Sequence, residues 1–307
     1  MSKSSLKNAS NSLKIDTKTR IFFQERGFTI EKQIGQGSFG VVFRGYKSRK
    51  KRSTSRNKRH SVGIEPIAVK MINISKIDQA TQQIYLPREL EALSSVHHRN
   101  VVKVYEINKS CGHLFIFMEF CSNGDIAGYV TKHGTAGESL SQQWFQQTAD
   151  ALYYIHHTTH MVHRDVKMDN VLLDNYMNAK LTDFGFAKLC WDKEGQVVQL
   201  TDSYCGTVPY MSPQILARTK YNPYLADGWA LGVMLYVMLE GEFIFYGDAS
   251  EILPLMWDFP RYLQKALTNM RKCSQDSAKR CIFRFLDPNE KTRMTFSQLM
   301  EEPYMKR

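Results

Sequence analysis

The chain lacks any run of apolar residues long enough to cross a membrane. Its first segment, Met1–Arg20, is polar and rich in Ser and Lys, and it has no apolar stretch of the kind a secretory signal contains, so we expect the protein not to be secreted. The six cysteines show no C-x-x-C spacing. This argues against a structural metal site and favours free thiols in a reducing compartment.

Acidic residues are also scarce, since 30 Asp and Glu face 41 Lys and Arg and the formal net charge is +11. Such an excess suggests acidic partners. Much of it is local, because Lys47–His60 carries eight Lys and Arg and no acid. The tract contains no aromatic residue, which argues against specific binding of single-stranded nucleic acid. A solvated loop, a nuclear-import signal and a patch for acidic partners all remain open for it.

A chain of 307 residues can form one large domain or two small ones. We expect residues 1–27 to form a flexible leader, although Ile21-Phe22-Phe23 could pack on the domain. Hydrophobic periodicity then predicts the following elements: a strand, a glycine-rich turn and a strand from Phe28; strands over Ile67–Ile72, Val101–Ile107 and Leu114–Phe120; an amphipathic helix over Trp144–His157; and a helix that is apolar all round over Trp229–Leu239.

The glycine-rich turn contains Gly35, Gly37 and Gly40 in the pattern G-x-G-x-x-G. Glycines allow the backbone to approach phosphate oxygens closely and to present its N–H groups to them. The pattern alone is weak, because a dinucleotide-binding turn or a plain hairpin gives the same letters. A dinucleotide fold requires a helix directly after the last glycine, whereas β-branched Val41-Val42 follow here and favour a strand.

A set of polar residues follows in the stretch from His163 to Gly185. Asp165 can take a hydroxyl proton, Lys167 brings a cation, and Asn170 and Asp183 offer the oxygen ligands that magnesium prefers. These residue types suit phosphoryl transfer, which depends mostly on positioning and electrostatic stabilisation.

Together these motifs resemble the eukaryotic protein kinases, with Val166 where the signature H-R-D-L-x-x-x-N has leucine. The sequence Leu-Pro-Arg-Glu at 86–89 resembles the testis-specific serine kinases, a calcium/calmodulin-kinase-like branch. The resemblance runs from about Phe28 to Tyr304. It implies an α+β, bilobal fold. The N-lobe over 28–121 would be a small antiparallel sheet with one helix and a basic insert at about 47–61, and the C-lobe over 122–305 would be mostly helical.

The resemblance also implies ATP and Mg²⁺ as cofactors. By family position, Asp165 accepts or orients the proton of the incoming hydroxyl, Lys167 neutralises charge on the γ-phosphate, and Asn170 and Asp183 hold magnesium. Lys70 pairs with the phosphates and with Glu89. The nucleotide-binding residues implied are Ile34, Gly35, Gly37, Gly40, Val42, Ala68, Lys70, Met118, Glu119, Cys121 and Leu172.

The family further implies regulatory and specificity residues. Ser203 and Thr201 are candidate phosphorylation sites, with phosphate on Ser203 expected to meet Arg164. Thr207 matches the threonine that braces the catalytic residues in serine/threonine kinases, and Asp227 matches the buried anchor of the catalytic loop. Asp125 and Asp169 could favour arginine or lysine upstream of the target, or be merely exposed acids, and Phe186 goes with serine over threonine as acceptor.

Three positions depart from the family pattern. Gln214 stands where the activation segment usually ends in glutamate, facing the expected Arg293. A glutamine can still accept a hydrogen bond, so we expect the contact to persist with a looser segment. Gly228 replaces a larger apolar residue, and residues 242–245 lack the usual Pro-Phe.

We therefore expect an active, monomeric serine/threonine protein kinase in the cytoplasm, with the basic insert as a candidate route to the nucleus. Its partners would be protein substrates and an upstream activating kinase, with no specific nucleic acid and no membrane. A role in germ cells follows from the resemblance alone. The alternatives are a pseudokinase scaffold, supported by Gln214 and Gly228, and a basic nucleic-acid-binding module, which explains the charge but not the catalytic set.

Overall fold

The computed structural model describes residues 16–37, 40–49, 63–76, 90, 96–191 and 198–306. The chain forms two compact units, one made of Met1–Leu86 and Val104–Phe120 and the other of Pro87–Lys103 and Cys121–Arg307. The change from the first unit to the second after Phe120 lies within one residue of the predicted end of the N-lobe at 121. Residues 96–103, which we assigned to the N-lobe, belong instead to the second unit.

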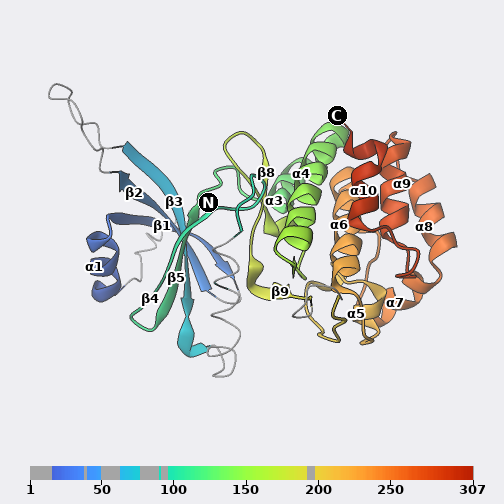
Figure 1. Ribbon diagram of the computed structural model, residues 1–307. Coiled ribbons are helices and arrows are strands. Elements are labelled where there is room, and N and C mark those ends of the chain that lie inside the picture. Colours follow the sequence, from blue (N-terminus) through green and yellow to red (C-terminus); the bar gives the residue numbers. More distant parts are fainter. Residues whose placement is uncertain are drawn as a thin grey trace, which may run out of the picture. The chain divides into compact units, whose positions relative to one another are not determined.

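The first unit is built on one antiparallel sheet (Figure 1). Its strands follow the order β1-β2-β3-β5-β4, with bounds β1 Phe28–Gly37, β2 Gly40–Arg49, β3 Gly63–Asn73, β4 Val104–Ser110 and β5 His113–Glu119, and a short 3₁₀ turn, η1, covers Ile74–Lys76. The expected strand at Val101 begins three residues later than predicted, because Val101 instead forms a bridge with Leu181 in the second unit.

The prediction of a flexible leader is wrong for residues 16–27. Helix α1 (Thr17–Glu25) begins after Asp16, whose side chain accepts a hydrogen bond from the backbone N–H of Thr19. Phe22 and Phe23 on this helix are buried. They join a cluster on one face of the sheet with Phe28, Ile67, Val69, Phe115 and Phe117. Hydrophobic burial of these rings, and not helix propensity, fixes α1 in place.

Strand register sends a different set of side chains to the other face of this sheet. Val42 pairs with Lys70, and Ala68 pairs with Met118. Because side chains alternate along a strand, Ala68 and Lys70 point away from their buried neighbours Ile67 and Val69. Val42, Ala68, Lys70 and Met118 therefore share the face opposite α1.

The second unit is mostly helical (Figure 1). Its helices are α3 Ile126–His133, α4 Gly137–Thr158, α5 Pro213–Leu216, α6 Pro223–Glu240, α7 Ala249–Trp257, α8 Phe259–Thr268, α9 Asp276–Phe285 and α10 Phe296–Glu301. Short strands β6 Met161–Val162, β7 Val171–Leu173, β8 Ala179–Leu181 and β9 Lys188–Leu189 form two antiparallel pairs, β6 with β9 and β7 with β8. The 3₁₀ turns are η3 Met168–Asn170, η4 Phe184–Phe186, η5 Val208–Tyr210 and η6 Pro303–Met305.

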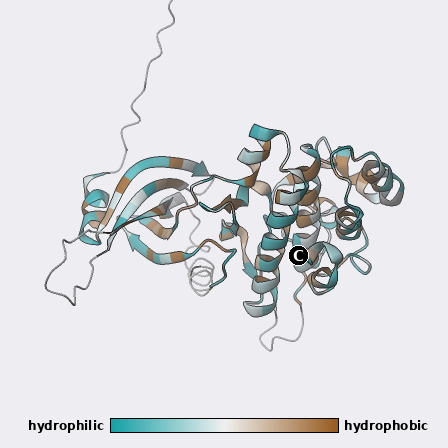
Figure 2. Ribbon diagram, turned by 90° about the horizontal axis from the view of Figure 1, so that it is seen from above, coloured by the Kyte–Doolittle hydropathy of each residue, from teal (hydrophilic) through white to brown (hydrophobic). Residues whose placement is uncertain are grey.

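Helices α4 and α6 form the centre of this unit. The predicted amphipathic helix is confirmed as α4, whose apolar stripe of Phe145, Ala149, Leu152 and Ile155 is fully buried. Helix α6 is buried along nearly its whole length, as its sequence predicted. Figure 2 shows hydrophobic residues along the ribbon of both units, with hydrophilic residues on the outer turns of the helices.

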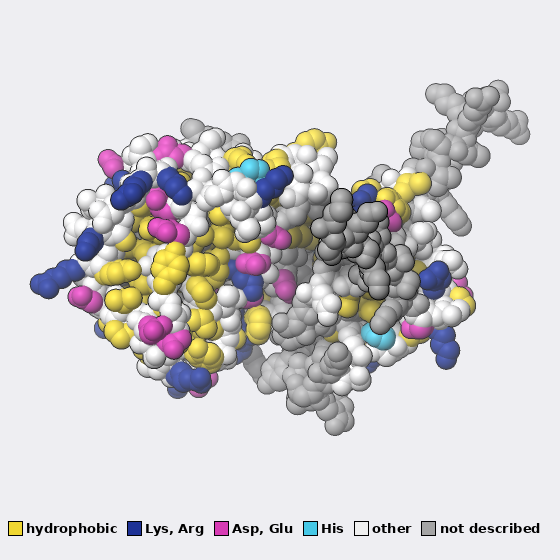
Figure 3. Space-filling model, turned by 180° about the vertical axis from the view of Figure 1, so that it is seen from behind, with side chains coloured by type: hydrophobic (Ala, Val, Ile, Leu, Met, Phe, Trp, Pro, Cys, Tyr) yellow, Lys and Arg dark blue, Asp and Glu magenta, His cyan; other side chains and the backbone are white. Residues whose placement is uncertain are grey.

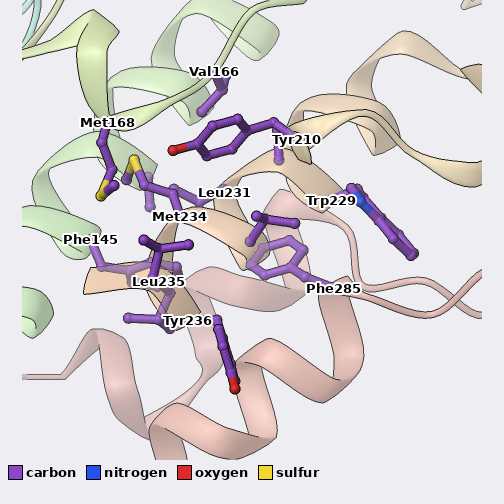
Figure 4. Packing of buried hydrophobic residues seen from close by; sticks show 14 of the residues in the cluster. Phe145, Val166, Met168, Tyr210, Trp229, Leu231, Met234, Leu235, Tyr236 and Phe285 are labelled. Atoms are coloured by element: carbon purple, nitrogen blue, oxygen red, sulfur yellow. The ribbon is translucent and has the colours of Figure 1, made fainter. Parts of the chain in front are cut away.

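The core around α6 also holds the loops that carry polar residues. Figure 4 shows Val166 from the loop after β6, Met168 from η3 and Tyr210 from η5 packed above Leu231 and Met234 of α6, while Phe285 of α9 packs on its other side. The surface view in Figure 3 shows hydrophobic side chains gathered in the middle of one face of the helical unit, with charged side chains around them. In the part of the chain that the structure describes, no helix combines the length and the apolar character needed to span a bilayer.

Candidate active site

The loop between β6 and β7 carries Asp165, and η3 at its end carries Asn170. Strands β7 and β8 pair antiparallel with Val171 opposite Leu181. Asn170 precedes β7 and Asp183 follows β8, so a short hairpin brings both to the same end of the sheet although thirteen residues separate them. The backbone N–H of Thr182 donates to the carbonyl of Asn170 at 2.9 Å and fixes this end.

Asp165 is buried, with 7 % of its surface exposed, and its carboxylate is held from both sides. Its Oδ1 accepts a hydrogen bond from the hydroxyl of Thr207 at 2.8 Å, and its Oδ2 lies 2.9 Å from Nζ of Lys167. Nζ of Lys167 also donates to the Thr207 hydroxyl at 2.8 Å. The expected bracing by Thr207 is therefore present, and it closes a ring of three side chains.

Asn170 completes this arrangement from the other side. Its side-chain nitrogen donates to the carbonyl oxygen and to Oδ2 of Asp165, at 2.8 and 3.0 Å. Because the amide nitrogen faces Asp165, the amide oxygen is turned away from it. An amide oxygen and the carboxylate of Asp183 at one end of a hairpin form an oxygen donor set that fits a divalent magnesium ion.

The backbone of the catalytic loop is anchored by Asp227 of α6, as expected. The N–H groups of His163 and Arg164 donate to its two carboxylate oxygens, each at 2.8 Å. Arg164 adopts a positive φ of 65° and Asp183 one of 59°. Such left-handed backbone is uncommon for residues with a side chain, so the buried bonds to Asp227 stabilise a strained loop geometry.

Two histidines support this anchor. His163 is fully buried, as predicted for a packed structural residue, and its Nε2 lies 2.9 Å from the carbonyl of Thr182. His156, on α4, places Nε2 at 2.8 Å from Oδ2 of Asp227. Burial lowers the pKa of His156 although the nearby Asp227 carboxylate opposes this, so the imidazole is neutral at physiological pH and donates from Nε2.

The first unit carries the other set of implied nucleotide contacts. Gly37 pairs with Gly40 where β1 meets β2. A Cβ at Gly40 would lie 2.2 Å from the carbonyl oxygen of Met71, so packing against β3 requires glycine there independently of any ligand. Ile34 is exposed, whereas Ala68 and Met118 are buried, and Glu119 ends β5. Glu89 lies outside the described residues, and its pairing with Lys70 stays a prediction.

Cys121 and Leu172 belong to the second unit. Cys121 is buried, and Leu172 is the middle residue of β7, bridged to Asp125. The Asp125 carboxylate accepts from the N–H of Gly128 at 2.7 Å and so caps α3. Asp169, in contrast, is exposed on η3.

The activation segment is described from Asp183 to Trp191 and from Val198 onward. Thr201 is buried, and its backbone pairs with that of Tyr221. The Thr201 hydroxyl donates to the hydroxyl of Ser203 at 3.0 Å, and the Tyr221 hydroxyl donates to the Ser203 carbonyl at 2.9 Å. Ser203 is the more accessible of the two candidate phosphorylation sites. Nε of Arg164 donates a hydrogen bond to the carbonyl oxygen of Phe186.

The departures from the family pattern are accommodated locally. Oε1 of Gln214 accepts a hydrogen bond from Arg293 at 2.9 Å, so the expected contact persists. A Cβ at Gly228 would lie 3.0 Å from the ring of Phe285, which occupies the space of the missing side chain. Phe243 packs edge-on against Tyr210, and Phe245 is buried and stacks on Trp229.

The sequence did not point to His156, Tyr221 or Glu290. The carboxylate of Glu290 accepts from the N–H of Asn222, the N-cap of α6, at 3.1 Å. Each of the three acts through a contact with a distant part of the chain, and no motif marks them. The one available signal was the short separation of Glu290 and Arg293, three residues apart in the chain.

Comparison with known proteins agrees with this geometry. The family model described as "Protein kinase domain" matches residues 28–305. Testis-specific serine/threonine-protein kinase 2 of Mus musculus is 32% identical over 291 residues, covering 92% of this chain and 74% of the relative. Testis-specific serine/threonine-protein kinase 4 of Homo sapiens is 32% identical over 255 residues, covering 80% and 72%. CBL-interacting protein kinase 31 of Oryza sativa subsp. japonica is 31% identical over 280 residues, covering 91% and 58%. The chain thus belongs to the protein kinase family and is a protein serine/threonine kinase.

Proposed function

We propose that this kinase uses ATP and Mg²⁺ and transfers the γ-phosphoryl group to serine, in preference to threonine, in proteins with basic residues upstream of the target. The observation that carries the catalytic part is the closed ring of Asp165, Lys167 and Thr207, which is assembled in the geometry that phosphoryl transfer needs. A scaffold that had lost transfer would need none of these three contacts.

The residues of the ring have different roles in the reaction. The Asp165 carboxylate orients the incoming hydroxyl and takes its proton, since Thr207, Lys167 and Asn170 fix the positions of both oxygens. Nζ of Lys167, beside that carboxylate, places a positive charge where the transferred phosphoryl group builds up negative charge. Asn170 and Asp183 would hold a magnesium ion, which would neutralise charge on the phosphate oxygens.

Substrate preference is assigned to two acids on the second unit, Asp169, which is exposed, and Asp125, which is partly buried. Asp169 is exposed, four residues past Asp165, and free to attract an arginine or lysine of a substrate. Asp125 is the weaker candidate, because one of its carboxylate oxygens already caps α3. The aromatic Phe186 after Asp183-Phe184-Gly185 supports serine over threonine.

Regulation and location are proposed on sequence and family grounds. Phosphorylation of Ser203 by an upstream kinase would order the activation segment. We propose a monomer that resides in the cytoplasm, with the basic tract of residues 47–61 allowing entry to the nucleus. The names of the two testis-specific relatives support a role in germ cells.

Incubation with radiolabelled ATP, magnesium and four matched peptides tests this proposal. The peptides present serine or threonine, each with arginines or with alanines upstream. We expect label above all in the serine peptide with arginines, and none with Asp183→Ala, which removes a magnesium ligand. Asp169→Asn should raise the KM for the arginine peptide alone, while the exposed Glu301→Gln on α10 leaves it unchanged. Equal label with wild type and Asp183→Ala would instead support the pseudokinase alternative.

A further inference from the structure

Arg293 is a buried cation bound mostly by neutral groups. Its side chain has no exposed surface, and all four of its hydrogen-bond acceptors are uncharged oxygens. Nε donates to the carbonyl of Asp287 at 2.7 Å and Nη1 to that of Leu225 at 3.4 Å. Nη2 donates to Oε1 of Gln214 at 2.9 Å and to the carbonyl of Pro288 at 3.3 Å. Hydrogen bonding is satisfied, but these partners leave the charge unbalanced.

A buried guanidinium without a counter-charge is unfavourable. Of the carboxylates in the described part of the chain, Glu290 is the one that comes within 4.0 Å of a guanidinium nitrogen of Arg293. Its side chain is itself largely buried, with 23% exposed, so solvent screens the pair weakly. Burial lowers the pKa of Arg293 to about 10, and Glu290 is the strongest opposing influence.

Glu290 has a second contact that leads toward the catalytic loop. Its Oε1 accepts from the N–H of Asn222 at 3.1 Å, and the Asn222 side chain caps α6 by accepting from the N–H of Tyr224 at 3.0 Å. Helix α6 carries Asp227, which holds the backbone of His163 and Arg164. One carboxylate therefore joins Arg293 to the helix on which the catalytic loop depends.

We propose that Glu290 supplies the counter-charge for Arg293 that Gln214 cannot, and that it acts as a positioning residue for α6 and the catalytic loop. The activation segment is then tied to Arg293 by a hydrogen bond to the uncharged amide of Gln214, while the ion pair lies in the loop that follows α9. The kinetic consequence rests on the proposed kinase activity, but the ion pair itself does not.

A charge-relocation experiment tests the assignment. Glu290→Gln, Gln214→Glu and the double variant Gln214→Glu/Glu290→Gln are compared with wild type in the full chain. Asp287→Asn is the comparison variant, because the Asp287 carboxylate on the same loop also raises the pKa of Arg293, but less than Glu290 does and from beyond 4.0 Å. The measurements are the melting temperature, kcat and the KM for ATP.

We expect Glu290→Gln to lower the melting temperature by about 5 °C. It should lower kcat several-fold with little change in the KM for ATP, because the contacts of Glu290 lead to Asp227 and the catalytic loop. The double variant should recover most of both losses, because the carboxylate then stands at 214, 2.9 Å from Nη2 in the present geometry. Asp287→Asn should lower the melting temperature clearly less than Glu290→Gln does, because its charge acts on Arg293 more weakly.

A double variant that melts as low as Glu290→Gln would overturn the proposal, since a carboxylate at position 214 would then not restore the stability lost at Glu290. So would a Glu290→Gln protein indistinguishable from wild type, or an equal loss from Asp287→Asn. If wild type transfers no phosphate, the proposed function fails, and the melting temperatures still decide whether Glu290 balances Arg293.

Discussion

The hydroxyl of Thr207 lies 2.8 Å from Oδ1 of Asp165, across forty-two residues of chain, and the same hydroxyl accepts a hydrogen bond from Lys167. One oxygen atom thus sets the spacing between the catalytic carboxylate and the catalytic amine. It also links the catalytic loop to the end of the activation segment, so a displacement of the segment would move the Asp165 carboxylate or break its hydrogen bond to Thr207.

Replacing Thr207 tests that link. Thr207→Ala removes two hydrogen bonds to charged groups, one to the Asp165 carboxylate and one from the Lys167 amine. We expect kcat to fall about 10- to 100-fold. Thr207→Ser keeps the hydroxyl and should retain most of the activity. Steady-state kinetics with a serine peptide measure both variants. Equal activity of the alanine and serine variants would show that the hydroxyl does not position Asp165.

The neutral state of His156 predicts a loss of stability in mild acid. Its pKa is lowered in the folded protein by burial, and His157 and His163 add to this while Asp227 opposes it. The unfolded chain therefore binds a proton more readily than the folded one below the ordinary pKa of 6.5. Stability is fully present above that pH and falls as the pH drops below it. Melting curves between pH 7.5 and 5.5 measure the effect.

The control for this prediction is His98, whose pKa is also lowered by burial. His156→Asn should flatten the acid slope of the melting temperature more than His98→Asn does, because His98 is only partly buried and lies near Asp150. An unchanged slope in His156→Asn would assign the acid sensitivity to other groups.

Gly228 should be intolerant of the larger residue that the family usually has. A Cβ there would lie 3.0 Å from one ring carbon of Phe285 and 3.1 Å from another. We expect Gly228→Val to cost about 1–3 kcal/mol in the free energy of unfolding through overpacking. Urea denaturation measures this. Phe285→Leu in the same chain should return part of the loss, and a double variant less stable than the sum of the two single changes would contradict the steric explanation.

Helix α1 should contribute strongly to the stability of the first unit. Phe23 is 2% exposed and lies 5.1 Å, centroid to centroid, from Phe115. Phe23→Ala should cost about 3–5 kcal/mol, whereas Ile21→Ala on the same helix, where the side chain is 48% exposed, should change stability by about 0.5 kcal/mol or less. Similar losses in the two variants would mean that α1 is held by something other than its buried rings.

The sequence predicted the catalytic residues of the second unit better than the residues that hold them in place. Asp165, Asn170 and Asp183 stand close together in the chain, and a hairpin of two short strands is enough to bring Asn170 and Asp183 to one end. Their spacing therefore carries geometric information. Thr207 and Asp227 could be assigned because the family motifs include them, and their hydrogen bonds in the structure agree.

Other features depend on tertiary contacts that no local pattern encodes. Two adjacent phenylalanines at positions 22 and 23 do not determine a helix, and only the uncovered face of the sheet gives them a place to pack. In the sequence, Glu290 is one of several charged residues in a polar stretch that follows Asp287-Pro288. Its role follows from the proximity of Arg293 and the end of α6, a relationship that the fold creates.

The match to the kinase family begins at Phe28, three residues after α1 ends. A recombinant fragment cut at that family boundary would retain every catalytic residue and yet lose the two rings, Phe22 and Phe23, that cover Phe115. Such a fragment would be prone to self-association during purification, so we expect a fragment that begins at Asp16 to stay in solution better than one that begins where sequence similarity starts.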